Sequence, residues 1–154
     1  MFRFVVVAST ALALSLASAS AAFAVSKKQM EANKKTVAAF YDAVLNKKDY
    51  DLAVKYVGKA GYKQHNPTAK DGVEGMQGFI NFLKDKFPNN RSEIKQIFAD
   101  GNYVIVHVHA VREPGTRGNA IIDIFRLDDK GKVVEHWDAV QPIPETAQNN
   151  NTMF

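Results

Sequence analysis

Residues 103–140 read YVIVHVHAVREPGTRGNAIIDIFRLDDKGKVVEHWDAV, and this stretch decides the fold. It holds three runs rich in β-branched and aromatic residues, separated by two short polar segments that contain glycine. A similar run at 92–99 precedes it, with Asp100-Gly101-Asn102 in between. Such runs are typical of strands, and glycine in the connections is typical of hairpin turns. The sequence therefore predicts an antiparallel meander of four strands, at 92–99, 103–112, 119–127 and 132–140.

The residues before this meander follow a helical period instead. Apolar residues recur on one face of 27–45 and again from Met76 to Phe87, and Asp49 can cap a short helix between them. Residues 62–67 are polar and end in a proline, so they cannot continue a helix. Three helices followed by an antiparallel meander predict an α+β fold, with the helices packed on one face of a curved sheet.

The first 24 residues have the three parts of a secretory signal peptide. Arg3 precedes an uncharged run rich in Val, Ala and Leu, which closes with Ala22-Phe23-Ala24. A basic residue, an apolar segment and small residues at the cleavage site are what signal peptidase recognises. An uncleaved membrane anchor is the alternative, but the second half of the run is Ala and Ser and so is weakly apolar. We therefore expect a mature chain that begins near Val25 and acts in the periplasm or outside the cell.

The remaining residues have the size of one domain, which we expect at 25–145, followed by a flexible tail at 146–154. Lys and Arg number 20 against 16 Asp and Glu, and the formal net charge is +4. The lysines are spread along the chain, so we do not expect the continuous basic surface of a nucleic-acid-binding protein. The chain has no cysteine, which excludes disulfides, thiolate metal sites and cysteine nucleophiles.

Ionisable residues lie inside the predicted strands, where a core side chain would be apolar. His107 and His109 alternate with valines, Asp123 lies between isoleucines, and His136 and Asp138 share one face of the last strand. Burying an unpaired carboxylate is costly, so we expect some of the histidines to pair with Asp123 or Asp138. Structural explanations stay open: a solvated or partner-facing sheet surface for the histidines, and a structural contact with a neighbouring strand for Asp123.

Four segments, taken together, resemble the SnoaL-like polyketide cyclase family of the NTF2-like superfamily. They are Tyr62-Lys-Gln-His-Asn-Pro67, Val106-His-Val-His109, Asp123-Ile-Phe-Arg126 and Glu135-His-Trp-Asp-Ala-Val-Gln-Pro-Ile-Pro-Glu145. They occur in the order that the family has, and the resemblance covers about residues 28–145. It implies a cone-shaped fold in which three helices and a curved sheet enclose an apolar pocket. It also implies homodimerisation through sheet faces or edges.

The resemblance further implies a chemistry, an intramolecular aldol ring closure that needs neither a metal nor an organic cofactor. The acidic position falls on Asp138, the supporting imidazole on His107, and Asp123 would orient a histidine. The positions implied for substrate binding are Tyr62, His65, Asn66, His109 and Trp137. A carboxylate in an apolar pocket is a stronger base, which can exchange a proton next to a carbonyl group while a positioned donor stabilises the oxyanion.

Three functions therefore stay open. The first is a cofactor-independent enzyme that acts by proton transfer on a small apolar carbonyl compound, as an aldol cyclase or an isomerase. The second is a non-catalytic module that binds a small apolar ligand or only dimerises, which the predicted export favours. The third is a metal site built from His107, His109 and either His65 or Asp123, since histidine and carboxylate ligands suit zinc or iron.

Overall fold

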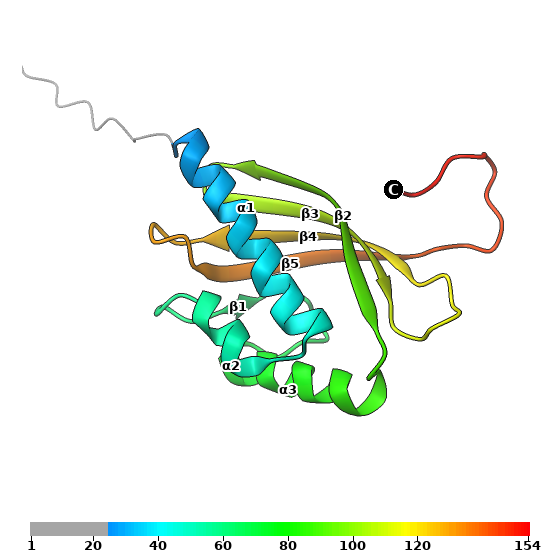
Figure 1. Ribbon diagram of the computed structural model, residues 1–154, viewed down its shortest axis with the longest axis horizontal. Coiled ribbons are helices and arrows are strands. Elements are labelled where there is room, and N and C mark those ends of the chain that lie inside the picture. The colour runs from blue at the N-terminus through cyan, green and yellow to red at the C-terminus, as the bar shows by residue number, and fades with distance from the viewer. Residues whose placement is uncertain (1–24) are drawn as a thin grey trace, which may run out of the picture.

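The computed structural model describes residues 25–154, and the predicted signal peptide lies outside that range. Figure 1 shows α1 crossing one face of a curved sheet, with α2 and α3 beside it, and the C-terminal tail extending past the strands before it turns back. Between residues 25 and 154, no helix has both the length and the apolar character needed to span a bilayer. The α+β fold predicted from the sequence is confirmed, including its three helices.

Helix α1, Lys27–Tyr41, begins at a capped residue and runs directly into a wider turn. The Ser26 hydroxyl accepts a hydrogen bond from the backbone N–H three residues later at 3.1 Å, which satisfies one of the free donors of the first turn. The chain then continues as a single π-helical segment, Asp42–Asn46. Val37 and Phe40 belong to the buried stripe of α1 and pack in the core with the sheet, as the helical spacing predicts.

Two further helices follow. Asp49 caps α2, Tyr50–Ala53, by accepting a hydrogen bond from the backbone N–H of Leu52 at 2.9 Å, as its place in the sequence predicts. A short 3-10 turn, Val54–Tyr56, extends α2. Helix α3, Gly72–Lys86, buries three apolar residues at helical spacing, namely Met76, Ile80 and Leu83.

The sheet has five strands in the order β1-β5-β4-β3-β2. Their bounds are Lys63–Gln64 (β1), Arg91–Asp100 (β2), Tyr103–Val111 (β3), Asn119–Leu127 (β4) and Val133–Pro142 (β5). The four long strands form the predicted antiparallel meander. Strand β1 was not predicted, and it pairs parallel to β5 over only two residues. A strand this short carries no alternating pattern, and it forms because its backbone joins the free edge of β5.

The sheet has an inner face toward the helices and an outer face away from them, and alternate residues of each strand belong to each face. On the inner face, Val104, Val106 and Val108 of β3 are 0% exposed and lie in the core. On the outer face, Phe98 and Tyr103 are 55% and 44% exposed. Of two consecutive residues in a strand, one therefore faces the buried core and the other faces the outer surface of the sheet.

The register of the long strands decides which polar residues meet. Asp123 of β4 lies opposite Val106 of β3 and Asp138 of β5, so all three belong to the inner face. His107 lies opposite Ile122 and belongs to the outer face. One site can therefore contain Asp123 and Asp138, but His107 lies on the other side of the sheet.

Candidate functional site

Asp123 is a carboxyl group placed among apolar side chains in the middle of β4. It is 4% exposed, with Phe125 on the same face and the buried Val106 opposite it on β3. Burial raises the pKa of this group, and the neighbouring His136 opposes that rise through its hydrogen bond and its charge. Asp123 therefore keeps a proton to a higher pH than a free aspartate does.

Two partners from different elements satisfy the Asp123 carboxyl group. The Nε2 atom of His136, on β5, lies 2.9 Å from Oδ1. The Tyr41 hydroxyl, at the end of α1, donates a hydrogen bond to Oδ2 at 3.1 Å. Burial, and after it the charge of Asp123, raise the pKa of Tyr41 well above its ordinary value, so the phenol keeps the proton that it donates. These three side chains connect α1 to two strands.

Asp138 lies opposite Asp123 on β5 and is only partly buried. Both of its carboxylate oxygens accept hydrogen bonds from the Nδ2 group of Asn66, each at 2.8 Å. The Oδ1 atom of Asn66 accepts from the backbone N–H and the hydroxyl of Thr68, at 2.8 and 2.7 Å. A backbone N–H can only donate, so the amide oxygen must face Thr68 and the NH₂ group must face Asp138. Asp138 is therefore held in one orientation and is still accessible to solvent.

We refer to Tyr41, Asn66, Asp123, His136 and Asp138 as the inner polar cluster. Aromatic rings line it: His136 stacks with Phe125 and Tyr62 at centroid distances of 4.7 and 6.3 Å. Burial, and after it the charges of Asp123 and Asp138, raise the pKa of Tyr62, so this phenol is also a neutral donor. The cluster thus combines carboxyl groups, an imidazole and phenols within an apolar wall.

The inner polar cluster contains groups that could hold a metal ion. One oxygen of Asp123, one of Asp138 and one ring nitrogen of His136 all lie within 4.8 Å of one another. Carboxylate and imidazole are ligands for zinc or iron. In the structure these groups already serve as hydrogen-bond partners, because His136 faces Asp123 and Asp138 faces Asn66. Proton exchange is the chemistry that this arrangement supports without rearrangement.

The structure brings four of the predicted site residues together and places the other four on the outer side of the sheet. The first group is Asp123, Asp138, Asn66 and Tyr62, and the second is His107, His109, His65 and Trp137. His107 was expected to support Asp138, and it does not reach it because the two side chains lie on opposite faces. The imidazole beside the carboxyl groups is His136. Its position two residues before Asp138, on the same strand face, was the available signal.

His65 and Trp137 form a separate group on the outer face. Their rings stack with centroids 4.6 Å apart and planes 7° from parallel. The Nε2 atom of His65 lies 2.8 Å from Oε1 of Glu135, whose other oxygen accepts from Arg126. The hydrogen bond with His65, followed by that from Arg126, lowers the pKa of Glu135. His65 therefore braces the segment after β1 against β5 and does not line the inner polar cluster.

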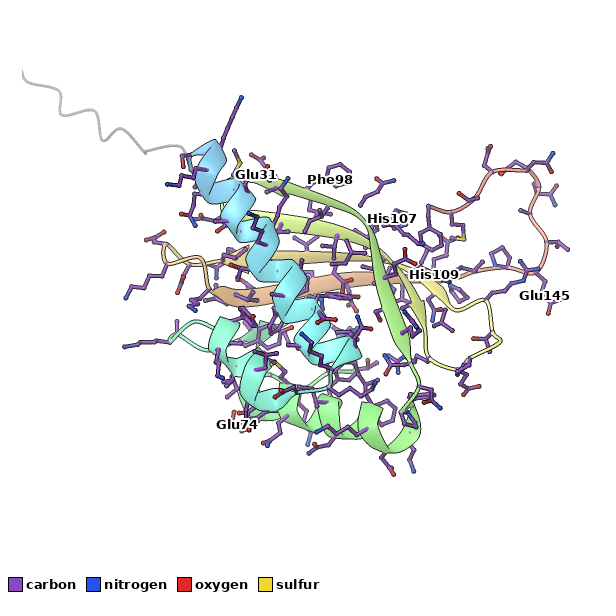
Figure 2. The ribbon with its side chains drawn as sticks, in the orientation of Figure 1. Glu31, Glu74, Phe98, His107, His109 and Glu145 are labelled. Atoms are coloured by element: carbon purple, nitrogen blue, oxygen red, sulfur yellow. The ribbon has the colours of Figure 1, made fainter. Side chains whose placement is uncertain are left out.

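His107 and His109 lie on the outer face, under the C-terminal tail. The Phe154 ring packs against both imidazoles at centroid distances of 5.1 and 4.9 Å, and Figure 2 shows both histidines on the side where the tail returns. The Nε2 group of His109 donates to the backbone carbonyl of Arg117 at 2.8 Å. Within residues 25–154, the group of three possible metal ligands is the one at Asp123, so the hypothesised site on His107 and His109 has no third ligand there.

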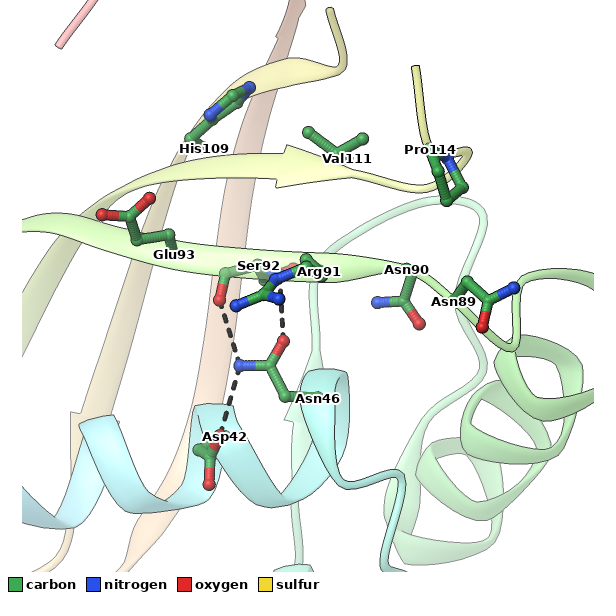
Figure 3. Close-up of a pocket in the computed structure, with 10 residues that line it drawn as sticks. All are labelled: Asp42, Asn46, Asn89, Asn90, Arg91, Ser92, Glu93, His109, Val111 and Pro114. Carbon is green, nitrogen blue, oxygen red and sulfur yellow. Dashed lines mark hydrogen bonds between the residues drawn. The ribbon is translucent and has the colours of Figure 1, made fainter. Parts of the chain in front are cut away.

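Two hollows of the structure lie away from the inner polar cluster. One, of about 580 Å³, opens beside the start of β2, and Figure 3 shows Asn46 hydrogen-bonded there to Asp42 and to the backbone of Ser92. The other, of about 400 Å³, lies between His109 and the C-terminal tail. Neither is lined by a residue of the inner polar cluster, so these hollows do not supply the apolar pocket expected around Asp138.

Comparison with known proteins identifies the family. The SnoaL-like domain family matches residues 37–136, most of the described chain. A search of curated proteins finds no match. Among solved structures, a candidate polyketide cyclase from Bacillus cereus ATCC 10987 is similar at 20% identity, with 75% of this chain and 78% of that chain covered and a TM-score of 0.64.

Two further solved structures are similar in the same way. A candidate isomerase of the SnoaL-like family from Agrobacterium tumefaciens str. C58 shares 16% identity over 74% of this chain and 98% of that chain, with a TM-score of 0.59. TsrD from Streptomyces laurentii shares 18% identity over 75% and 90%, with a TM-score of 0.58. Likeness at these identities shows the fold alone. The chain belongs to the SnoaL-like family and has the NTF2-like fold, which it shares with these solved structures.

Removing the Tyr41 hydroxyl should destabilise the protein. In Tyr41→Phe the ring can still pack edge-on against Phe125, but Oδ2 of the buried Asp123 loses its donor. An unsatisfied buried acceptor costs about 1–3 kcal/mol, and the free energy of unfolding measured in urea should fall by that amount. Tyr103→Phe is the matched control, because Tyr103 is 44% exposed and should change that free energy by less than about 0.5 kcal/mol. Equal effects of the two substitutions would contradict the assigned bond.

Proposed function

We propose that this protein is exported and binds a small apolar carbonyl compound, with which it exchanges a proton without a cofactor. Such a transfer is the elementary step of aldol cyclisation and of isomerisation. The observation that carries the proposal is Asp138, a partly buried carboxylate held by Asn66 beside the buried Asp123–His136 pair. Family membership supports the proposal without deciding it, since one fold hosts many functions.

Asp138 is the general acid/base that we assign. Its carboxylate takes the proton from the carbon next to the carbonyl group, the C–H electron pair forms the enolate double bond, and the carbonyl π electrons move to oxygen. In an isomerase the same carboxyl group returns the proton to another carbon. In an aldol cyclase the enolate carbon attacks a second carbonyl group, whose oxygen receives the proton. Both cycles regenerate the carboxylate, so protons and electrons balance within the substrate.

The developing enolate oxygen needs a neutral donor, and Tyr62 is the group that we assign. Its phenol keeps its proton because burial and the charges of Asp123 and Asp138 raise its pKa. Removing one preorganised donor of this kind typically lowers kcat by a factor of roughly 100 or more. Asp123 and His136 are hydrogen-bonded to each other, so Asp138 is the carboxyl group that we expect to exchange protons with a ligand.

A non-catalytic binding module is the second candidate, and the position of the hollows favours it. Both lie away from the inner polar cluster, one beside the start of β2 and one under the C-terminal tail. A ligand seated in either of them would not touch Asp138. The two functions are therefore distinguished by whether Asp138 exchanges protons with a carbonyl compound.

Asp138→Asn should abolish proton exchange and leave the fold intact. Asparagine has the size of aspartate but cannot take up the proton. We expect wild-type protein to accelerate hydrogen–deuterium exchange at the carbon next to the carbonyl group of 2-tetralone, followed by proton NMR in D₂O. The substitution should slow this exchange roughly 100-fold or more.

Asp100→Asn is the matched control for this experiment. Asp100 is exposed at the end of β2, so the variant should exchange at the wild-type rate. Circular dichroism and thermal unfolding check that both variants fold. Exchange that survives in Asp138→Asn would eliminate the assigned base. A wild-type protein that accelerates exchange in none of a panel of small ketones would favour the binding module.

Export is the second part of the proposal. It is supported by Arg3, the uncharged run that follows it and the small residues Ala22 and Ala24. Expression of the full chain in a Gram-negative bacterium should give a periplasmic protein whose intact mass corresponds to a first residue at Val25. A membrane-bound product that keeps residues 1–24 would show an uncleaved anchor instead.

The expected homodimer stays a prediction. The outer face of the sheet offers a surface for it, since Phe98, Tyr103 and Ile122 are 55%, 44% and 40% exposed there. Phe154 covers the part of this face that carries His107 and His109. Light scattering of the purified protein gives the mass that decides between one copy and two.

A further inference from the structure

Gln64 connects the Asn66–Asp138 pair and the Asp123–His136 pair of the inner polar cluster through one oxygen atom. It lies on β1, and its Oε1 atom accepts a hydrogen bond from the backbone N–H of Asn66 at 2.9 Å. The same oxygen lies 2.8 Å from Nδ1 of His136. It therefore contacts both the residue that holds Asp138 and the residue that pairs with Asp123. The proposed function assigns no role to this side chain.

The partners of the Gln64 amide determine its orientation. A backbone N–H can only donate, so the atom that faces Asn66 must be the oxygen and not the NH₂ group. The NH₂ group then points to the Tyr62 hydroxyl, 3.4 Å away. Because an amide oxygen can only accept, Nδ1 of His136 must carry a hydrogen atom.

The hydrogen atom on Nδ1 decides what Nε2 can do. A neutral imidazole has one N–H group, so Nε2 presents a lone pair to Oδ1 of Asp123, 2.9 Å away. This contact is a hydrogen bond only if one more proton lies between Nε2 and Oδ1, whichever atom holds it. With the opposite tautomer, Nε2–H would donate to a bare carboxylate, and the pair would hold no additional proton.

We propose that Gln64 is a positioning residue that fixes the Nδ1–H tautomer of His136 and so makes the Asp123–His136 pair hold one proton beside Asp138. The same oxygen anchors the backbone of Asn66, whose amide orients Asp138. The Oε1 atom of Gln64 thus influences both the protonation of the Asp123–His136 pair and the orientation of Asp138. The tautomer is independent of catalysis, whereas its effect on turnover rests on the proposed function.

Nitrogen-15 NMR of the folded protein reads the tautomer. In the labelled wild-type chain near neutral pH, long-range proton–nitrogen correlations of the His136 ring should show a hydrogen atom on Nδ1. Gln64→Leu removes the acceptor, and the pattern should shift to Nε2–H donating to Asp123. Gln64→Glu keeps an acceptor at the same place and should retain the hydrogen atom on Nδ1.

Gln77→Leu is the matched control for the loss of the amide. Gln77 is exposed on α3, so this variant should leave the His136 pattern unchanged. Gln64→Met takes the place of Gln64→Leu where the latter does not fold. A wild-type ring without hydrogen on Nδ1 overturns the proposal. A folded Gln64→Leu or Gln64→Met protein that keeps the wild-type pattern also overturns it.

A second readout separates this role from the proposed function. Where Asp138 exchanges protons with a ketone, Gln64→Leu should lower kcat roughly tenfold or more with little change in KM, and Gln64→Glu should restore most of it. A tautomer that shifts in Gln64→Leu, together with an inactive wild type, supports the positioning role and removes the proposed reaction. A tautomer that does not shift, together with an active wild type, overturns the positioning role and leaves the reaction standing.

Discussion

The buried carboxyl group of Asp123 is the constraint on which the rest of the site depends. It lies in the middle of an apolar sheet face, where a carboxylate without partners would be strongly unfavourable. Tyr41 and His136 provide those partners, so the end of α1 must reach β4, and β5 must lie beside it. The same residues pack as aromatic rings against Phe125, which couples polar satisfaction to core packing.

Strand alternation divides the polar residues of this protein between two surfaces. On β5, His136 and Asp138 point inward to the cluster, while Trp137 points outward and stacks on His65. The segment at β1 alternates in the same way, with Gln64 directed to His136 on the inner side. Gln64 of β1 and His65 directly after it thus make contacts on opposite sides of the sheet.

Most of the fold could be predicted because α1, α3 and the four long strands are long enough to show their periods, and Asp49 marks the start of the short α2. Strand β1 could not, since two residues show none. Asp123 and Asp138 were found because an ionisable residue inside an apolar run is visible within one strand. His107 was assigned to Asp138 from the family resemblance, although His136 lies two residues before Asp138 on the same face of one strand. Residues of different strands, such as His107 and Asp138, are related to one face or the other only by register. A shift of one residue exchanges the faces, so that relation comes from the structure.

The protonation of Asp123 tests the central claim most directly. Carbon-13 NMR of the aspartate side-chain carboxyl carbons, recorded against pH, gives a titration midpoint for each group. Because burial raises the pKa of Asp123, its midpoint should lie above the ordinary value of 3.8, and the His136 ring signals should change in the same step. A midpoint at or below 3.8 would contradict the claim, since burial would then not govern the protonation of Asp123.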